Sequence, residues 1–220
     1  MQYKICESLT DAWNEWYSLL SMQGKSDDSR NGEVCGEIIN AVTVIKNPTL
    51  NILKSNIRNL PMRYAVGELL WYLSGSNKLS AIKKYSKAWE SLSDDGETVN
   101  SAYGYRISQQ FGFDQWKYVL ELLRKDPNTR QAVIHIKDAS DKPTKDTPCT
   151  VSLQFLLRDG KLNLTTYMRS NDIWLGFPYD VFSFTCLQIL MANELDVEIG
   201  EYTHIAGSLH LYTRNASTSN

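Results

Sequence analysis

Two alternating segments joined by Asp159 and Gly160 place the strongest constraint on the fold of this 220-residue chain. The segments TVSLQFLLRD and KLNLTTYMRS alternate in the manner of β-strands, and an Asp-Gly pair between such segments is typical of a tight hairpin turn. The hairpin places Cys149 just before the first strand and Arg169 near the end of the second strand. The pattern therefore predicts that these two side chains lie close together.

Helical periodicity appears in four further segments. Residues 9–22 form an apolar stripe with Ser8 or Thr10 as the N-cap, and residues 61–75 begin with proline and end with glycine. An amphipathic helix is expected at 114–125, and the apolar run after Pro178 is long enough for a buried helix. Further strands are expected at about 34–46, in QAVIHIK and in EYTHIAGSLHLYT, the last as one strand or two. These elements predict an α+β fold with a mostly antiparallel or mixed β-sheet core and a long buried central helix.

Composition and charge narrow the class of protein. A chain of this length suits one domain spanning 1–220, and its formal charge of −2 is too small to bind a polyanion through a bulk field. No apolar run is long enough to span a membrane and no signal-peptide pattern is present, so we expect a cytoplasmic protein, in the host cytoplasm if viral. The four cysteines lack CxxC spacing, which predicts reduced thiols and no metal site.

Cys149 is the candidate nucleophile. It follows a proline at the mouth of a strand, and a nearby guanidinium favours the reactive thiolate. Arg169 followed by Ser170 combines a planar five-donor fork with a hydroxyl, which suits phosphate oxygens. The alternatives are a structural ion pair for Arg169 and a small buried hydrophobic role for the cysteine.

Three other side chains are candidates for the site that contains Cys149 and Arg169. Glu68 lies inside an apolar helix, where a carboxylate is costly unless it is paired, neutralised or functional. We interpret it as an acid or base with a raised pKa facing a cleft, and a structural pair with an arginine is the alternative. His210 and Tyr212 alternate along a strand and face one side, where they would bind sugar hydroxyls or simply pack in the core.

The segments around these residues resemble the thymidylate synthase family over about residues 8–214. They are GELLWYLSG around Glu68, NSAYG around Tyr103, DPNTRQ around Arg130, PCTVSLQ around Cys149, MRSNDIWLGFPYD and GSLHLYT. The resemblance implies a thymidylate synthase-like fold in a single catalytic domain, with a sheet face that forms a homodimer. It also implies transfer of a one-carbon unit from 5,10-methylenetetrahydrofolate to carbon 5 of a pyrimidine nucleoside monophosphate.

The resemblance further implies a role for each matching residue. Cys149 would add to ring carbon 6, Glu68 would relay protons, and Tyr103 would help to remove the proton from carbon 5. The phosphate would be held by Arg169, Ser170, Arg30 and, across the dimer interface, Arg130. The remaining contacts would be Asp180 to the base, His210 and Tyr212 to the ribose, and Asp172 and Trp89 to the folate.

Asp180 indicates the base. The family usually has asparagine at this position, whose amide matches the edge of uracil, whereas cytosine presents an amino donor and an acceptor nitrogen. A carboxylate accepts from that amino group and shares a proton with the ring nitrogen, so Asp180 predicts a cytidylate substrate. The alternative is a local register change that moves Asp180 away from the base.

Other details resemble the phage deoxycytidylate hydroxymethylases. MRSND, the glutamine that closes PCTVSLQ, and GSLH match that subgroup, and Leu92 replaces a tryptophan that synthases usually carry. A less enclosed pocket would admit water to the methylene intermediate and yield a hydroxymethyl group, whereas a dry pocket would favour hydride transfer and a methyl group. The predicted reaction is the conversion of dCMP to 5-hydroxymethyl-dCMP.

Three departures leave alternatives open. Gln131 stands where the family commonly has a second arginine, and Thr150 replaces the histidine of many synthases. The sequence also ends soon after Tyr212, whereas family members continue for several tens of residues, so the chain is a short-form member or a truncated one. The alternatives for function are a thymidylate synthase that methylates dUMP, a dCMP or CMP methylase, and an inactive nucleotide-binding homologue.

Overall fold

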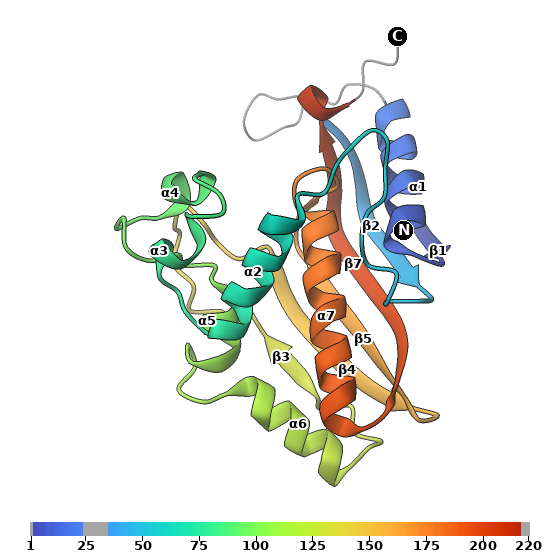
Figure 1. Ribbon diagram of the computed structural model, residues 1–220, viewed down its shortest axis with the longest axis vertical. Helices are drawn as coiled ribbons and strands as arrows, with labels where there is room; N and C mark the ends of the chain where they lie inside the picture. The colour runs from blue at the N-terminus through green and yellow to red at the C-terminus, as the bar shows by residue number, and fades with distance from the viewer. Residues whose placement is uncertain (1, 24–34, 217–220) are drawn as a thin grey trace.

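The computed structural model describes residues 2–23 and 35–216, and Figure 1 shows helices in front of one face of a twisted sheet. The strands are β1 (Gln2–Cys6), β2 (Cys35–Ile45), β3 (Val133–His135), β4 (Thr150–Arg158), β5 (Lys161–Met168), β6 (Asn171–Asp172) and β7 (Glu198–Tyr212). Their order is β1-β2-β7-β5-β4-β3, with the short β6 also paired to β7. The pairs β1–β2, β5–β7 and β6–β7 are parallel and the others are antiparallel, so the predicted mixed sheet is confirmed.

The predicted hairpin joins β4 to β5. Asp159 and Gly160 both have positive φ values, of 51° and 73°, which is the backbone of a type I′ turn. Thr150 pairs with Met168 at the far end of the hairpin, so the residues that flank them, Cys149 and Arg169, are neighbours as predicted. The backbone N–H of Arg169 donates to the carbonyl oxygen of Cys149 at 2.8 Å.

The long helices agree with the sequence prediction. They are α1 (Leu9–Met22), α2 (Met62–Ser74), α6 (Gln115–Lys125) and α7 (Phe177–Leu195). Ser8 caps α1 through a capping box with Asp11, and Gly75 ends α2 in the left-handed conformation. The short elements α3 (Leu79–Ile82), α4 (Ala88–Leu92), α5 (Tyr103–Ser108) and the 3₁₀ turn η1 (Thr213–Asn215) were not predicted, because segments this short carry too little periodicity.

Helix α7 is the predicted long buried central helix. It crosses the sheet in Figure 1 and contacts β5, β7, α1, α2 and α6. Val181, Phe184 and Met191 are fully buried on it, and Trp13 of α1 donates its indole N–H to the Ile173 carbonyl oxygen just before it, at 2.9 Å. The helix therefore fixes the position of its own first turn, where Asp180 lies.

The inward and outward alternation of β2 and β7 changes near Asn40, while the register between the two strands stays continuous. The register of β2 on β7 passes over Asn40, which has a φ of 55°. Ala206 and Leu209 both face the core although they are three residues apart, so the alternation shifts by one residue between them. His210 and Tyr212 alternate with the buried Leu209 and Leu211 and line the cavity described below, and β7 is one strand rather than two.

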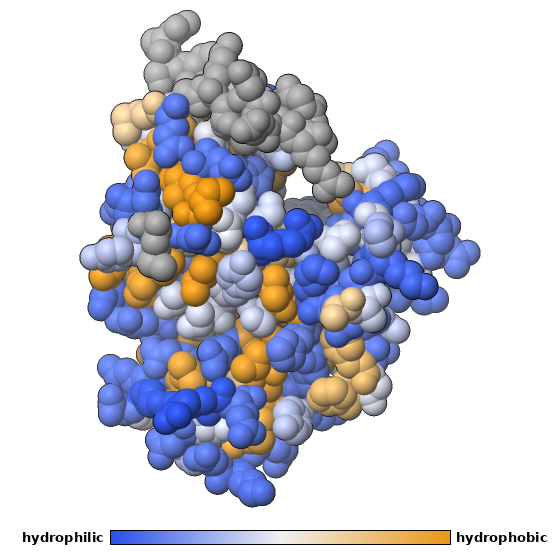
Figure 2. All heavy atoms as spheres, turned by 180° about the vertical axis from the view of Figure 1, so that it is seen from behind, coloured by the Kyte–Doolittle hydropathy of each residue, from blue (hydrophilic) through white to orange (hydrophobic). Residues whose placement is uncertain are grey.

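The opposite face of the sheet carries exposed apolar side chains. Figure 2 shows this side of the molecule, with apolar residues among charged ones. Tyr3, Ile5, Ile39 and Tyr167 are all exposed, and the parallel register places Tyr3 and Ile5 beside Val42 and Val44. No helix within residues 2–23 and 35–216 is long and apolar enough to cross a bilayer.

Candidate active site

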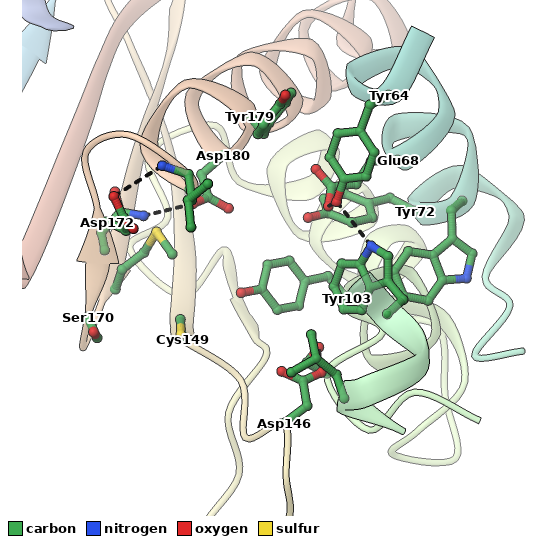
Figure 3. A pocket seen from close by; sticks show the side chains of 18 of the residues that line it. Tyr64, Glu68, Tyr72, Tyr103, Asp146, Cys149, Ser170, Asp172, Tyr179 and Asp180 are labelled. Carbon is green, nitrogen blue, oxygen red and sulfur yellow. Dashed lines mark hydrogen bonds between the residues drawn. The ribbon is translucent and has the colours of Figure 1, made fainter. Parts of the chain in front are cut away.

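A cavity of about 400 Å³ lies between the sheet and helices α2, α4, α5 and α7. Figure 3 shows side chains from these elements converging on it. The predicted site residues in its lining are Glu68, Trp89, Tyr103, Cys149, Ser170, Asp172, Asp180, His210 and Tyr212. The fold therefore gathers in one place residues that are far apart in the sequence.

Cys149 and Arg169 form the nucleophile end of the cavity. The Sγ atom of Cys149 lies 3.7 Å from Nη2 of Arg169, and the guanidinium also donates to the carbonyl oxygens of Pro148 at 3.0 Å and Thr147 at 2.9 Å. Burial raises the pKa of the Cys149 thiol, and the adjacent guanidinium opposes that rise. The expected guanidinium is in place, but burial outweighs its effect on the pKa of the thiol.

Glu68 is held by a chain of hydrogen bonds on α2 and α4. The Tyr64 hydroxyl donates to Oε1 of Glu68 at 2.8 Å, and the Trp89 indole N–H donates to the Tyr64 oxygen at 3.0 Å. Burial, with a further contribution from the Asp180 charge, raises the pKa of Glu68 to about 8, while the Tyr64 hydrogen bond opposes the shift. Its partner is thus a tyrosine and not an arginine, and the carboxyl can exchange a proton near neutral pH.

Asp180 lies in the first turn of α7 and is 9% exposed. The side-chain amide of Asn171 donates to its Oδ2 atom at 2.8 Å. Burial raises the pKa of Asp180 to about 7, against the lowering effect of this hydrogen bond. Asp180 can therefore present either a carboxylate or a carboxylic acid to a ligand.

Tyr103 begins α5 and points its hydroxyl into the cavity (Figure 3). The backbone N–H of Thr150 donates to this hydroxyl at 3.3 Å, and the ring lies 5.4 Å from that of Tyr72. Burial, together with the charges of Asp180 and Cys149, raises the pKa of Tyr103 well above its usual range. The phenol therefore keeps its proton, and its oxygen is held beside the strand that follows Cys149.

The residues predicted to contact the ribose, His210 and Tyr212, and the folate candidate Asp172 also line the cavity. The rings of His210 and Tyr212 pack edge to face, with centroids 5.2 Å apart. Oδ1 of Asp172 accepts from the backbone N–H groups of Trp174 at 2.7 Å and Leu175 at 3.1 Å. Oδ2 of Asp172 is buried without a hydrogen-bond partner among the described residues, so it remains available to a ligand donor.

One predicted phosphate ligand, Arg130, does not line this cavity, and another, Arg30, cannot be placed. Arg130 is exposed in the loop between α6 and β3, where its carbonyl oxygen accepts from Gln154 at 3.0 Å, and its side chain is not part of the lining. Arg30 lies outside the described residues. Ser170 lines the cavity, and Arg169, which does not, contacts the lining residue Cys149, so these two are the phosphate candidates among the described residues.

The sequence interpretation missed several residues of the site. Tyr64 precedes Glu68 by four residues on α2, a spacing that places both on one helical face and could have revealed the pair. Asn171 stands between two predicted ligands, and Asp146 lines the cavity three residues before the cysteine, with its carboxylate accepting from the Ser101 hydroxyl. A single sequence carried no signal for the last contact because Ser101 lies 45 residues away. Among the residues that the structure describes, no cluster of three or more histidine, cysteine or acidic side chains could hold a metal ion.

Known proteins with similar sequences include phage enzymes. Deoxyuridylate hydroxymethyltransferase of Bacillus phage SP01 is 36% identical over 196 residues, which is 82% of this chain and 51% of that protein. The protein of the same name from Pseudomonas phage M6 is 32% identical over 198 residues, 88% of this chain and 56% of that protein. The chain thus spans about half the length of these relatives.

Solved structures with a similar fold are thymidylate synthases. Thermostable thymidylate synthase A from Bacillus subtilis superposes with a TM-score of 0.80 at 25% identity, over 93% of this chain and 80% of that one. Thymidylate synthase from T4 phage gives 0.79 at 22% identity, over 91% and 76% of the two chains, and supports the fold alone. The thymidylate synthase family profile matches residues 11–219. The chain belongs to the thymidylate synthase family.

Proposed function

We propose that this chain transfers a one-carbon unit to carbon 5 of a pyrimidine nucleoside monophosphate, with dCMP as substrate and 5-hydroxymethyl-dCMP as product. The observation that carries the proposal is the 3.7 Å contact between Cys149 Sγ and Arg169, at a cavity that also holds the carboxyl groups of Glu68 and Asp180, whose pKa values are raised. A nucleophile, an anion-binding group and proton-exchanging acids in one pocket are the parts that such a reaction needs. Residues 1–220 act as one catalytic domain in this proposal.

Cys149 activates the ring. Its thiolate adds to carbon 6, and carbon 5 becomes electron-rich enough to attack a one-carbon electrophile. Because burial raises the pKa of the thiol, the guanidinium of Arg169 is needed to offset part of that cost. The phosphate sits at Arg169 and Ser170, with His210 and Tyr212 at the sugar.

Glu68 and Tyr103 handle the protons. Glu68, with a pKa of about 8, delivers a proton to the ring and recovers it without leaving the working pH range. Tyr103 keeps its own proton, so its oxygen serves to orient the water that removes the carbon 5 proton.

Asp180 selects the base. As a carboxylate it accepts from the amino group of cytosine, and as an acid it donates to the ring nitrogen, so both forms bind cytosine. The ionised form repels the carbonyl oxygen that uracil presents at the same place. A mismatch of this kind costs roughly 1–3 kcal/mol in a buried site.

A second candidate is the same transfer to dUMP. The names of the two phage relatives, deoxyuridylate hydroxymethyltransferases, favour it. The pKa of about 7 of Asp180 also favours it, since a protonated carboxyl offers uracil one donor and one acceptor, as an amide does.

The folate co-substrate fits the rim of the cavity. The orphaned Oδ2 of Asp172 matches an N–H donor of a pterin, and Trp89 with Leu175 supplies an apolar wall. When bound, 5,10-methylenetetrahydrofolate would supply the one-carbon unit. Leu92 lines the same wall without a polar group or an aromatic ring, and this more open wall lets water complete the product as a hydroxymethyl group.

The active species in this proposal is a homodimer. The exposed apolar side chains of the open sheet face, Tyr3, Ile5, Ile39 and Tyr167, would be buried between two subunits. Arg130, exposed on its own subunit, would then complete the phosphate site of the other one. Analytical ultracentrifugation of the protein and of Arg130→Ala tests for the dimer, which the variant should keep. Calorimetric titration with dCMP tests the phosphate site, since the variant should bind nucleotide more weakly.

Tritium release from carbon 5 is the test of the reaction. With methylenetetrahydrofolate, the protein should release tritium from labelled dCMP about 10- to 100-fold faster than from labelled dUMP. Mass spectrometry of the product from a mixture of CMP, dCMP, UMP and dUMP then identifies the sugar and the added group. Formation of tetrahydrofolate indicates hydroxymethyl transfer, and formation of dihydrofolate indicates methyl transfer.

Each outcome decides between the candidates. Faster release from dUMP would support the second candidate and reject the cytosine assignment. Nucleotide binding without any release would mean that the chain is a binding protein. Cys149→Ala is the control, because it removes the nucleophile and should abolish release while it leaves the phosphate site intact.

A further inference from the structure

Asp180 is the end of a buried series of hydrogen bonds, called the relay below, that runs from Tyr202 and His204 in the sheet through Asn171 to the cavity. Asn171 Nδ2 lies 2.8 Å from Asp180 Oδ2, Asn171 Oδ1 lies 2.9 Å from His204 Nε2, and His204 Nδ1 lies 2.8 Å from the Tyr202 hydroxyl. Tyr202, His204 and Asn171 are at most 3% exposed. Tyr202 and His204 do not line the cavity, so they act on a ligand only through Asn171 and Asp180.

The chemistry of the four groups fixes which one donates and which one accepts in each hydrogen bond of the relay. Burial lowers the pKa of His204 to about 3, so the imidazole is neutral and carries one N–H. An ionised Asp180 requires a donor at Oδ2, so Asn171 must turn its amide nitrogen toward it and its oxygen toward His204. His204 then donates from Nε2, and its Nδ1 accepts from the Tyr202 hydroxyl.

If every hydrogen bond of the relay ran in the opposite direction, the proton of Asp180 would have to lie on Oδ2. If His204 carried its proton on Nδ1, Asn171 would turn its amide to donate to Nε2 and would present its oxygen to Asp180. Two oxygens would then meet, and the contact would survive only with a proton on Oδ2. The direction of the hydrogen bonds in the relay therefore decides which oxygen of Asp180 can be protonated.

Gly176 and Phe177 pack closely against the Asn171–Asp180 contact and the His204 ring. A Cβ atom on Gly176 would lie 2.9 Å from Asn171 Nδ2 and 3.1 Å from Asp180 Oδ2, so any larger residue here would displace one of these two side chains. The ring of Phe177 packs edge to face on His204, with centroids 5.0 Å apart, and holds the plane of the imidazole. Two successive residues at the start of α7 thus protect the relay.

We propose that Tyr202, His204 and Asn171 are positioning residues that set base specificity, because their directional relay keeps Oδ2 of Asp180 as an acceptor and confines its proton to Oδ1. The base then meets one pattern of donor and acceptor instead of a mixture of two. This inference rests on the proposed function, in which Asp180 contacts the base.

Two variants break the relay at different distances from the cavity. Asn171→Leu removes the donor to Asp180 with little change in size, and Tyr202→Phe removes a single hydroxyl that lies outside the cavity lining. We expect the ratio of kcat/KM for dCMP to kcat/KM for dUMP to change about tenfold in Asn171→Leu and about fivefold in Tyr202→Phe. The direction of the change is toward equal use of the two nucleotides.

Thr185→Val is the matched control. Thr185 is also fully buried and lies on α7 one turn beyond Asp180, but its hydroxyl donates to the carbonyl oxygens of Val181 at 2.7 Å and Phe182 at 3.0 Å. Its loss should lower thermal stability to a degree similar to the loss of the Tyr202 hydroxyl and leave the ratio unchanged. Ratios in Asn171→Leu and Tyr202→Phe within about twofold of this control would overturn the inference, while activity of the unmodified protein would still support the proposed function.

Nitrogen NMR tests the direction without any activity. The chain has three histidines, so ¹⁵N-histidine labelling gives few signals, and a His204→Gln variant identifies the one from the relay. We expect the proton of His204 on Nε2 in the unmodified protein and a mixture of tautomers in Tyr202→Phe. A proton on Nδ1 in the unmodified protein would contradict the relay, and absent activity on both nucleotides would contradict the proposed function instead.

Discussion

The carboxyl groups of Glu68 and Asp180 come from different helices, α2 and α7, and enter the same buried cavity (Figure 3). Burial is the main cause of the raised pKa of Glu68, and the charge of Asp180 adds to it. The two acids are therefore held in an environment that favours their neutral forms.

Glu68 should consequently contribute less to the stability of the protein as pH rises. Glu68 ionises near 4.5 when unfolded and near 8 when folded, so its contribution is present below 4.5 and is lost as pH rises toward 8. Glu68→Gln keeps an acceptor for Tyr64 and removes this loss, which amounts to several kcal/mol at most, at about 1.4 kcal/mol per pKa unit. Urea unfolding at pH 5, 6.5 and 8 measures the difference, and parallel pH dependence of the two proteins would contradict it.

The Tyr64 hydroxyl should tune the acid that it contacts. Its hydrogen bond lowers the pKa of Glu68, so Tyr64→Phe should raise that pKa and move the corresponding limb of the pH–rate profile to higher pH. We expect kcat to fall about tenfold, because Glu68 also loses its orientation. Profiles of kcat from pH 6 to 9.5 test this, with the half-exposed Tyr118→Phe on α6 as control. Identical profiles for the two variants would disprove a role of Tyr64 in proton transfer.

Arg169 should control the reactivity of the nucleophile in the absence of nucleotide. The guanidinium lowers the pKa of Cys149 against the effect of burial, so Arg169→Gln should slow alkylation by iodoacetamide at pH 8 several-fold. Peptide mass mapping also reports on Cys186, whose pKa is raised by burial and which contacts Asn51 instead of an arginine. Equal slowing of both cysteines would indicate a general change in structure and not a local electrostatic effect.

The segment that carries Tyr103 should depend on one buried ion pair. Arg106 on α5 is 1% exposed, donates to both carboxylate oxygens of Asp141 at 2.9 and 3.0 Å, and donates to the Ile136 carbonyl oxygen at 2.9 Å. Arg106→Leu strands the Asp141 carboxylate and should lower the free energy of unfolding by roughly 3–5 kcal/mol.

The exposed pair of Lys117 and Asp114 provides the control for this ion pair. Lys117→Met should lower the free energy of unfolding by less than about 1 kcal/mol, because solvent screens the pair. Urea midpoints compare the two variants. A similar small loss in both would show that the Arg106–Asp141 pair does not anchor α5.

Elements with local signals were predictable from the sequence. The capping residue of α1, the proline and glycine that bound α2, and the Asp159–Gly160 turn act through the adjacent backbone, so a single sequence contains the cause of each. The strand β1 was missed, because five residues become a strand only by pairing with β2 across more than thirty positions of sequence.

The active-site residues also divide into those that the sequence indicated and those that only the folded structure brings together. The residue types that do chemistry, such as Cys149, Glu68 and Asp180, were evident from their setting and from the family resemblance, and the sheet and helices bring them to one cavity. The resemblance also named Arg130, but in the part of the chain that the structure describes this side chain does not line the cavity.

The amino-acid sequence by itself determined which helices and turns form and which reactive groups are present, because those depend on near neighbours and on side-chain chemistry. Only the tertiary structure decided their protonation and their partners. The pKa of Glu68, the hydroxyl of Tyr64 beside it and the relay from Tyr202 to Asp180 arise from burial and from contacts between distant segments. Desolvation and hydrogen bonding act through space, so they appear only once the chain has folded.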